Sequence, residues 1–252
     1  MSRQRLGQHF LLQGSTLERI ARAACPEREP LVIEMGPGRG ALTARLLERA
    51  DRVIAIEIDI ELVQLLRDKF RGEPRLTLIH ADALETDLGQ WGDAAVAGNL
   101  PYYAATPIIE KTLVLGARLR RAVFLVQKEV AARLTAKPGT RDYGYLSVKT
   151  QFLADVKALF DVRPSAFRPP PKVDSTLVRL EPHDRAAELG IADPVQFLGF
   201  ASLCFRQKRK TLRNNLAAAY GKDALTGRPE AAKRAEELTL EQFAELYRRL
   251  VS

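Results

Sequence analysis

Over the first 180 residues, short apolar runs alternate with segments in which hydrophobic positions recur at helical spacing. The apolar runs are typical of buried strands, and each is followed by an amphipathic, helix-like segment. Strands are expected at 31–34, 52–56, 76–80, 94–97 and 122–126, and helices at 41–49, 61–70 and 107–115. This alternation predicts an α/β fold, a Rossmann-like, doubly wound and mostly parallel sheet.

Beyond residue 126 the pattern predicts helices at 128–135 and 146–153, then strands at 156–162 and 175–180 that can pair antiparallel. Four prolines between these strands, Pro164 and 169–171, cannot donate ladder hydrogen bonds, so an extended loop is expected there. From Pro194 only helical signals remain, at 194–220 and 240–250. We therefore predict two domains: residues 1–183 with the sheet, and residues 184–252, a small all-α domain.

The charge of the chain indicates a polyanionic partner. The 252 residues carry a formal net charge of +8, with a pI near 9.6. Two local stretches are basic: 118–141, with seven basic residues and one acid, and 206–213, with five basic residues and no acid. The basic residues of the second stretch are expected on the outer faces of a helix, where they would bind RNA: Arg206, Lys208, Arg209, Lys210 and Arg213.

Other classes of protein are disfavoured by what the sequence lacks. No apolar run reaches the ~18 residues of a membrane helix, and no signal-peptide core follows Met1. Cys25 and Cys204 lie far apart without a C-x-x-C pair, and there are only three histidines. We expect a cytoplasmic protein with structural thiols, no metal site and no membrane partner.

The most informative motif is Asn99-Leu100-Pro101-Tyr102, which follows the fourth expected strand. It combines an amide, a rigid turn and an aromatic ring, and these can hold a flat base that carries an exocyclic amine. The Asn99 side-chain oxygen and a backbone carbonyl freed by the turn can accept the two amine hydrogens. The same four residues are also compatible with an ordinary strand-to-loop turn.

Polar residues at three earlier strand ends point to a ligand. Glu34 to Gly40 forms a glycine loop, and its proline and G-x-G-x-G spacing favour a cofactor without phosphates. Glu57 ends the next strand, where doubly wound folds hold a ribose diol. Asp82 follows the third strand and can accept from an adenine amine. Singly, Glu57 can be a surface acid and Asp82 a helix cap; the ordered series favours a site.

Seven segments resemble the motifs of class I S-adenosylmethionine-dependent methyltransferases, specifically the ribosomal RNA adenine dimethyltransferase (KsgA) family. They are Arg5-Leu6-Gly7-Gln8-His9-Phe10-Leu11, the loop 34–40, Ala55-Ile56-Glu57-Ile58-Asp59, His80-Ala81-Asp82-Ala83-Leu84, the Asn99 to Tyr102 motif, Phe167-Arg168-Pro169-Pro170-Pro171-Lys172-Val173-Asp174-Ser175, and Phe205-Arg206-Gln207-Lys208-Arg209-Lys210-Thr211-Leu212-Arg213-Asn214. The resemblance runs from about Arg5 to the C-terminus. One departure is His9, which stands where the family motif often has asparagine.

The resemblance implies N6,N6-dimethylation of two adjacent adenosines in a hairpin near the 3′ end of small-subunit (16S) ribosomal RNA, as a step in small-subunit biogenesis. The cofactor would be S-adenosyl-L-methionine, and the partner small-subunit RNA or the pre-30S particle, with the chain acting as a monomer. Cofactor contacts are expected from His9, Leu11, Gly36, Gly38, Glu57, Asp82, Ala83 and Asn99. The target base is expected at Asn99, Leu100, Pro101, Tyr102 and Phe167, with the two rings stacking on it.

Three alternatives remain open. The chain can be a resistance methyltransferase for large-subunit ribosomal RNA, a DNA adenine methyltransferase, or a non-catalytic RNA-binding assembly or transcription factor that retains the cofactor fold. The triple proline before Lys172 and the 208–213 segment look more like the small-subunit enzyme. The intact set of Gly36, Glu57, Asp82 and Asn99 speaks against a factor without catalysis.

Overall fold

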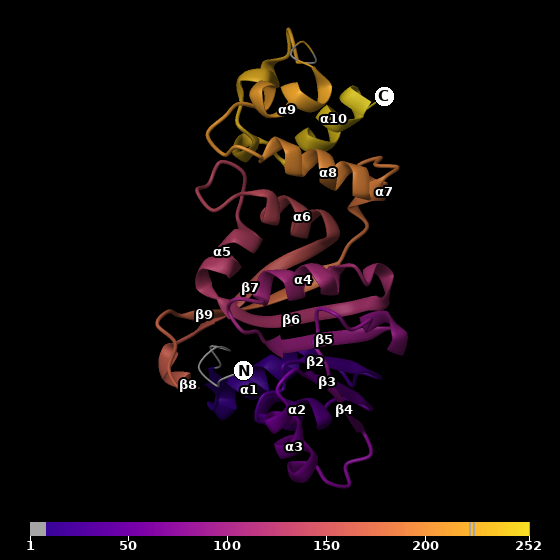
Figure 1. Ribbon diagram of the computed structural model, residues 1–252, viewed down its shortest axis with the longest axis vertical. Coiled ribbons are helices and arrows are strands. Elements are labelled where there is room, and N and C mark those ends of the chain that lie inside the picture. Colours follow the sequence, from indigo (N-terminus) through magenta and orange to yellow (C-terminus); the bar gives the residue numbers. More distant parts are fainter. Residues whose placement is uncertain (1–8, 222, 224, 252) are drawn as a thin grey trace. The chain divides into compact units, whose positions relative to one another are not determined.

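The computed structural model describes residues 9–221, 223 and 225–251, which form two compact units (Figure 1). The first unit comprises the described part of Met1–Ala131 together with Asp155–Pro182, and the second comprises Ala132–Ala154 with the described part of His183–Ser252. Arg5 to Gln8 of the N-terminal motif lie outside the described residues.

The first unit is built on a seven-stranded sheet with the order β4-β3-β2-β5-β6-β9-β7 (Figure 1). Its strands are β2 (Val32–Met35), β3 (Val53–Glu57), β4 (Leu76–His80), β5 (Ala94–Asn99), β6 (Leu119–Gln127), β7 (Ala154–Val162) and β9 (Ser175–Pro182). The pairs β2–β3, β3–β4, β2–β5 and β5–β6 are parallel, and β9 is antiparallel to β6. The expected doubly wound, mostly parallel sheet with an antiparallel C-terminal strand is confirmed.

The helices of this unit are α1 (Gly14–Ala24), α2 (Ala41–Leu47), α3 (Ile60–Lys69) and α4 (Ala105–Leu113), with 3-10 turns η2 (Leu88–Trp91), η3 (Gly116–Arg118) and η4 (Pro164–Ala166); α5 (Lys128–Thr135) crosses the boundary between the units. The strand order reverses between β2 and β5. Right-handed crossovers on the two sides of that reversal lie on opposite faces of the sheet, so α2 and α3 cover one face and α4 the other (Figure 1).

The central strands are mostly apolar because helices cover both of their faces. Every residue of β2 and β3 is buried, including Glu34 and Glu57. The core between the sheet and its first helices contains Ile20 of α1, Leu46 of α2 and Val123 of β6. Cys25 lies in this core, and burial raises the pKa of its thiol to about 12.

Two residues of the N-terminal motif pair with the start of the segment 167–174, here called the proline loop, and form a second, two-stranded sheet. Strands β1 (Phe10–Leu11) and β8 (Phe167–Arg168) pair antiparallel, with Leu11 opposite Phe167, and a cis peptide bond follows at Arg168-Pro169. The extended loop expected between β7 and β9 is thus interrupted by the short elements η4 and β8. The segment up to Arg168 finds hydrogen-bond partners in β1, and only the prolines behind it are excluded from pairing.

The second unit is helical. It contains α6 (Tyr145–Leu153), α7 (Arg185–Glu188), α8 (Pro194–Cys204), α9 (Leu212–Tyr220) and α10 (Leu240–Val251), with the 3-10 turns η5 (Pro229–Ala232) and η6 (Ala235–Glu237). Aromatic side chains fill its core, where the rings of Phe152 and Phe197 lie 4.6 Å apart and Tyr247 packs edge-on against Phe197. Cys204 is buried there, and burial raises its pKa to about 12.

Two expectations for this part of the chain differ from the structure. Residues 132–154 were expected in the first domain, but their contacts place them with His183–Ser252 in the second unit. The segment 194–220 is two helices, and its basic residues 206–210 lie in the loop between them. The buried Asn215 amide donates to Cys204 O and Gln207 O and accepts from Gln207 N, which satisfies backbone groups that a continuous helix would have used.

Within the described residues, no helix combines the length and the apolar character needed to cross a membrane.

Substituting Gly98→Ala is expected to destabilise the first unit. A Cβ at this position would lie 2.7 Å from the carbonyl oxygen of Met35 on the neighbouring strand, so the β2–β5 pair would have to shift, at a cost of about 1–3 kcal/mol. Gly14→Ala is the control, since its Cβ meets nothing within 4 Å. Urea unfolding of both variants checks this; equal midpoints would show that the strand pair can shift freely.

Candidate active site

A single cleft in the first unit gathers every residue that the sequence assigned to a cofactor or a target base. It lies at the carboxyl ends of β2, β3, β4 and β5, where the strand order reverses, the place at which open α/β sheets bind ligands. The expected residues that line it are His9, Leu11, Gly36, Gly38, Glu57, Asp82, Ala83, Asn99, Leu100, Pro101, Tyr102 and Phe167.

The glycine loop turns sharply at one side of the cleft. Gly36, Gly38 and Gly40 have φ values of 67°, 56° and 72°, which L-residues with a side chain rarely adopt. A Cβ on Gly40 would collide with Leu66 and Phe70, both at 2.6 Å, so this glycine allows α2 to begin against α3. A Cβ on Gly36 would meet nothing within 4 Å. The backbone at Gly36 is therefore open to the close approach of a ligand.

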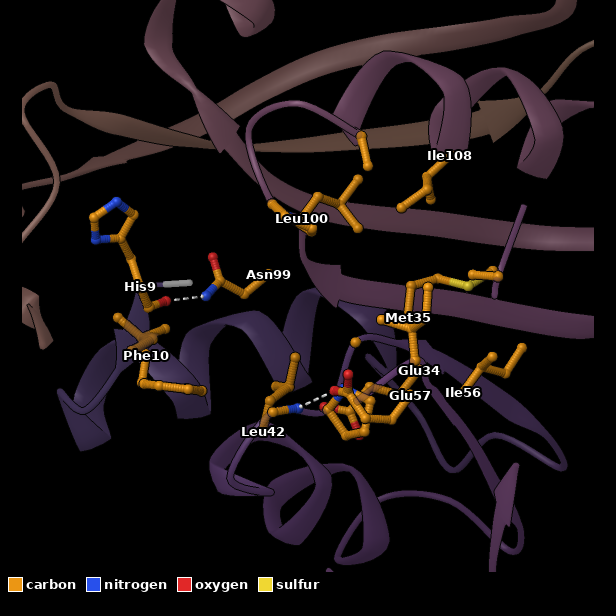
Figure 2. A pocket seen from close by; sticks show the side chains of 18 of the residues that line it. His9, Phe10, Glu34, Met35, Leu42, Ile56, Glu57, Asn99, Leu100 and Ile108 are labelled. Carbon is orange, nitrogen blue, oxygen red and sulfur yellow. Dashed lines mark hydrogen bonds between the residues drawn. The ribbon is translucent and has the colours of Figure 1, made fainter. Parts of the chain in front are cut away.

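The Glu57 carboxylate is fixed by backbone donors. Gly38 N donates to Oε2 at 3.1 Å (Figure 2), and Asp59 N donates to Oε1 at 3.0 Å. Burial raises the pKa of Glu57, while these hydrogen bonds act to lower it. A carboxylate has about four lone-pair sites, so Glu57 can still accept from a hydroxyl group in the cleft.

A second carboxyl group, Glu34, lies beneath the glycine loop and lines the same cleft (Figure 2). Its exposed fraction is 1%, and among the described residues its Oε2 has no hydrogen-bond partner. Burial raises the pKa of Glu34 to about 8, and the nearby charge of Glu57 adds to that effect. At neutral pH Glu34 is therefore predominantly protonated in the folded protein.

Asp82 and Ala83 form the corner after β4. Asp82 Oδ1 accepts from Leu84 N at 2.8 Å, and the residues that follow form a turn instead of the helix that Asp82 could have capped. The side chain of Lys111 on α4 donates to Leu84 O. This bond ties the corner to the helix that follows the Asn99 to Tyr102 motif.

The Asn99 side chain is oriented by the N-terminal motif. Its Nδ2 donates to His9 O at 2.9 Å, which leaves the side-chain oxygen as an acceptor within the cleft (Figure 2). Leu100 N donates to Leu125 O, and Ala104 N closes a turn onto Pro101 O. The motif therefore leaves the sheet directly after Asn99.

Tyr102 is partly buried, and its hydroxyl lies 3.3 Å from Ser175 Oγ. Burial raises the pKa of Tyr102, so the phenol is neutral at physiological pH. Phe167 is only 5% exposed: it belongs to the core of the first unit and also contributes to the wall of the cleft.

His9 adopts an arrangement that its sequence context did not indicate. Its Nδ1 lies 2.8 Å from Pro169 O, and its ring centroid is 5.5 Å from that of Tyr102. The expected contact between His9 and a cofactor carboxylate stays a prediction.

Phe10 and Tyr103, which line the cleft, and Ser175, which contacts Tyr102, were not among the expected site residues. Phe10 packs against Gly38 and lies under the guanidinium of Arg39 at 4.7 Å, Tyr103 is 63% exposed at the cleft, and Ser175 orients Tyr102. Their positions in the sequence next to expected site residues could have indicated them. Phe10 lies between the expected contacts His9 and Leu11, Tyr103 follows the target-base motif, and Ser175 ends the motif that begins at Phe167.

The first basic stretch does not form one continuous basic surface. Arg120 pairs with Glu29 at 2.9 Å, Arg121 pairs with Glu29 and Glu181, and Lys128 pairs with Asp161 at 2.6 Å. These carboxylates come from distant parts of the sequence, so the local count of charges overestimated the free positive charge in the first unit.

The second basic stretch is exposed on a loop of the second unit. Arg206, Lys208, Arg209 and Lys210 follow α8, and Arg213 lies in the first turn of α9. Lys208 Nζ donates to Arg141 O at 3.1 Å, which brings the end of the first stretch beside the second. Across the described residues, no group of three or more His, Cys, Asp or Glu side chains is placed to hold a metal ion.

Comparisons with known proteins give a consistent result. A family model described as ribosomal RNA adenine dimethylase matches residues 1–251. A protein of Acidobacterium capsulatum named ribosomal RNA small subunit methyltransferase A is 45% identical over 256 residues, covering 98% of this chain and 90% of the relative. The structure of a dimethyladenosine transferase from Plasmodium falciparum aligns with a TM-score of 0.82 at 26% identity, over 94% of this chain and 96% of that one. The structure of the 23S rRNA methyltransferase ErmE aligns with a TM-score of 0.72 at 28% identity, over 96% and 100%.

Glu34→Gln is expected to change how stability depends on pH. The pKa of Glu34 rises from 4.5 to about 8 on folding, so the folded chain binds this proton more tightly than the unfolded chain. The stabilisation that this proton gives to the folded chain is complete below about pH 4.5 and is lost as the pH rises to about 8. Over this range the free energy of unfolding falls by up to about 1.4 kcal/mol per pH unit. Glutamine does not ionise, so the variant should gain stability relative to the wild type across this range.

Chemical denaturation at several pH values between 5 and 8 measures this difference. The control is Glu48→Gln, which replaces an exposed glutamate at the end of α2. Parallel pH profiles for the wild type and Glu34→Gln would contradict a protonated Glu34.

Proposed function

This chain belongs to the ribosomal RNA adenine dimethylase family, and we propose that it converts two adjacent adenosines in a hairpin near the 3′ end of small-subunit (16S) ribosomal RNA to N6,N6-dimethyladenosine. The methyl donor is S-adenosyl-L-methionine, and the reaction contributes to small-subunit biogenesis. The observation that supports this most strongly is the single cleft that joins the glycine loop, Glu57 and Asp82 to the Asn99 to Tyr102 motif.

The residues of the cleft fit this cofactor. The open approach at Gly36 and the free lone pairs of Glu57 suit a ligand with a ribose diol and no phosphates. A sulfonium cation is compatible with a cleft lined by Glu57 and Asp82. In this proposal Gly36 and Gly38 pass close to the cofactor, Glu57 binds the ribose, Asp82 and Ala83 bind the adenine, and Leu11 and Asn99 close the remaining side.

When bound, the cofactor supplies an activated methyl group on sulfur. The chain then has to orient the target amine, whose lone pair is delocalised into the adenine ring. The Asn99 side-chain oxygen and the Leu100 or Pro101 carbonyl accept the two amine hydrogens and favour a geometry in which the lone pair points at the methyl group. No strong base is needed before attack. Such positioning can contribute about 7–11 kcal/mol to the lowering of the barrier.

A base that is stacked and paired within an RNA helix cannot present its amine to the cleft, so it has to leave its stack. We assign the stacking surfaces to Tyr102 and Phe167. The contact with Ser175 holds the Tyr102 ring in place, and the burial of Phe167 fixes the position of the ring that forms the other wall of the slot. A rigid pair of walls suits a base that stays bound, or returns, for the second methyl transfer.

We further propose that the exposed cations of the second unit bind RNA phosphates, which position the substrate and carry little sequence information. Arg206, Lys208, Arg209 and Lys210 form this basic loop, and Arg213 in the first turn of α9 and Arg141 extend it. The proposed partner is small-subunit RNA in a pre-30S particle in the cytoplasm, with the protein acting as a monomer. The similarity to ErmE makes a large-subunit substrate the second candidate.

The decisive assay offers labelled S-adenosylmethionine with unmethylated small subunits, large subunits or DNA, and then digests each product to nucleosides. Dimethyladenosine from small subunits alone is the expected result. Label confined to large subunits or DNA would replace the proposed substrate, and no label with any of them would favour a non-catalytic RNA-binding factor.

Asn99→Ala should lower the rate of methyl transfer by about 10²-fold or more, the size typical when one polar contact to a reacting group is lost. The control Gln64→Ala removes an exposed amide from α3 and should leave the rate unchanged. Single-turnover rates with saturating cofactor measure both variants. Full activity of Asn99→Ala would remove this residue from the mechanism.

Arg206→Ala combined with Lys208→Ala should weaken RNA binding and flatten its dependence on salt, because fewer counterions are released from the RNA. Cofactor affinity should not change. The matched control is Arg52→Ala with Arg67→Ala, which removes two exposed charges of the first unit. RNA titrations at several salt concentrations give the slope; equal slopes for both double variants would argue against phosphate contacts in the 206–210 loop.

A further inference from the structure

The residue that departs from the family motif, His9, makes specific contacts with its side chain. A carbonyl oxygen can only accept, so the 2.8 Å contact between His9 Nδ1 and Pro169 O requires the proton to reside on Nδ1. This bond links His9, the residue before strand β1, to Pro169, which lies 160 residues further along the chain.

The second contact of the His9 ring is with Tyr102. The centroids lie 5.5 Å apart with an angle of 35° between the ring planes, a separation typical of aromatic pairs. Tyr102 is also held on its hydroxyl side by Ser175. The ring assigned to the target base is therefore fixed at two points, and one of them is His9.

The backbone of His9 completes this arrangement, because its carbonyl accepts from Asn99 Nδ2. His9 thus touches three elements of the target side: the amide of Asn99, the ring of Tyr102 and the loop at Pro169. Glu57, the residue proposed to bind the cofactor ribose, lies elsewhere in the cleft. In Figure 2 the imidazole lies beyond Asn99 as seen from Glu57 and Glu34, and it is turned away from both carboxyl groups.

We propose that the side chain of His9 is a positioning residue of the target-base slot and not a ligand of the cofactor. It holds the Tyr102 ring and the proline loop at a fixed separation, so that the base enters a slot already formed. Only the backbone carbonyl of His9 orients Asn99, and this role survives substitution of the side chain. The inference rests on the proposed methyl transfer to adenosine, and it assigns a different function to His9 from the one its motif indicated.

Three variants separate the two contacts. His9→Phe retains a ring beside Tyr102 but loses the donor to Pro169 O, His9→Asn retains a donor but loses the ring, and His9→Ala loses both. For each variant we would measure the Kd for S-adenosylmethionine without RNA, the binding of unmethylated small subunits, KM and kcat for those subunits, and the ratio of monomethyl- to dimethyladenosine.

The Kd for S-adenosylmethionine should stay near the wild-type value in all three variants. The KM for small subunits should rise about three- to tenfold in His9→Phe and His9→Asn, the size expected for loss of one hydrogen bond or one ring pair, and by more in His9→Ala. The monomethyl fraction should rise in the same order, because a loosened slot releases the base before the second transfer. Melting temperatures near that of the wild type for His9→Phe and His9→Asn would show that these variants fold.

A tenfold weaker Kd for S-adenosylmethionine, with unchanged subunit binding and KM, would overturn the inference and make His9 a cofactor ligand. Wild-type kinetics in His9→Ala would overturn it as well. Failure of the wild type to form dimethyladenosine on small subunits would instead refute the proposed function, and the two binding measurements would still report which side of the cleft His9 serves.

Discussion

The pairing of β2 with β5 is the constraint on which the site depends. Val32, Ile33 and Glu34 lie opposite Ala95, Val96 and Ala97 in a parallel register, at the point where the strand order reverses. The crossovers on either side of this pair leave in opposite directions, and no helix can cover the carboxyl ends between them. The absence of a side chain at Gly98 lets the β5 backbone approach Met35 O. The glycine loop and Asn99 thus emerge side by side.

The remaining wall of the cleft comes from segments that are distant in sequence. Strand β1 pairs with β8, which puts Leu11 opposite Phe167, and His9 continues the contact to Pro169 and Tyr102. Ser175, the first residue of β9, reaches the hydroxyl of Tyr102. The same few contacts therefore close the cleft and orient the groups proposed to hold the target base.

The cleft of the first unit and the exposed loop of the second carry side chains of opposite charge. The cleft of the first unit contains carboxyl groups, of which Glu57 is fixed by backbone donors and Glu34 is largely neutral at neutral pH. Much of the positive charge on β6 is neutralised by Glu29 and Glu181. The exposed basic loop belongs to the second unit. A cationic cofactor and a polyanionic substrate can thus each find complementary charge.

Sequence patterns determined the doubly wound sheet and the polar motifs at its strand ends, because these depend on local periodicity and on the rule that parallel strands end at one edge. The resemblance to a known family added His9, Leu11 and Phe167 to the expected cleft. The tertiary structure decided what depends on partners far along the chain. Asn215 ends the helix before Arg206, Glu29 and Asp161 neutralise cations that the composition counted as free, and residues 132–154 join the second unit. The orientation of the His9 ring was decided in the same way. Its partners Tyr102 and Pro169 are brought to it by folding, and no local pattern around residue 9 could indicate them.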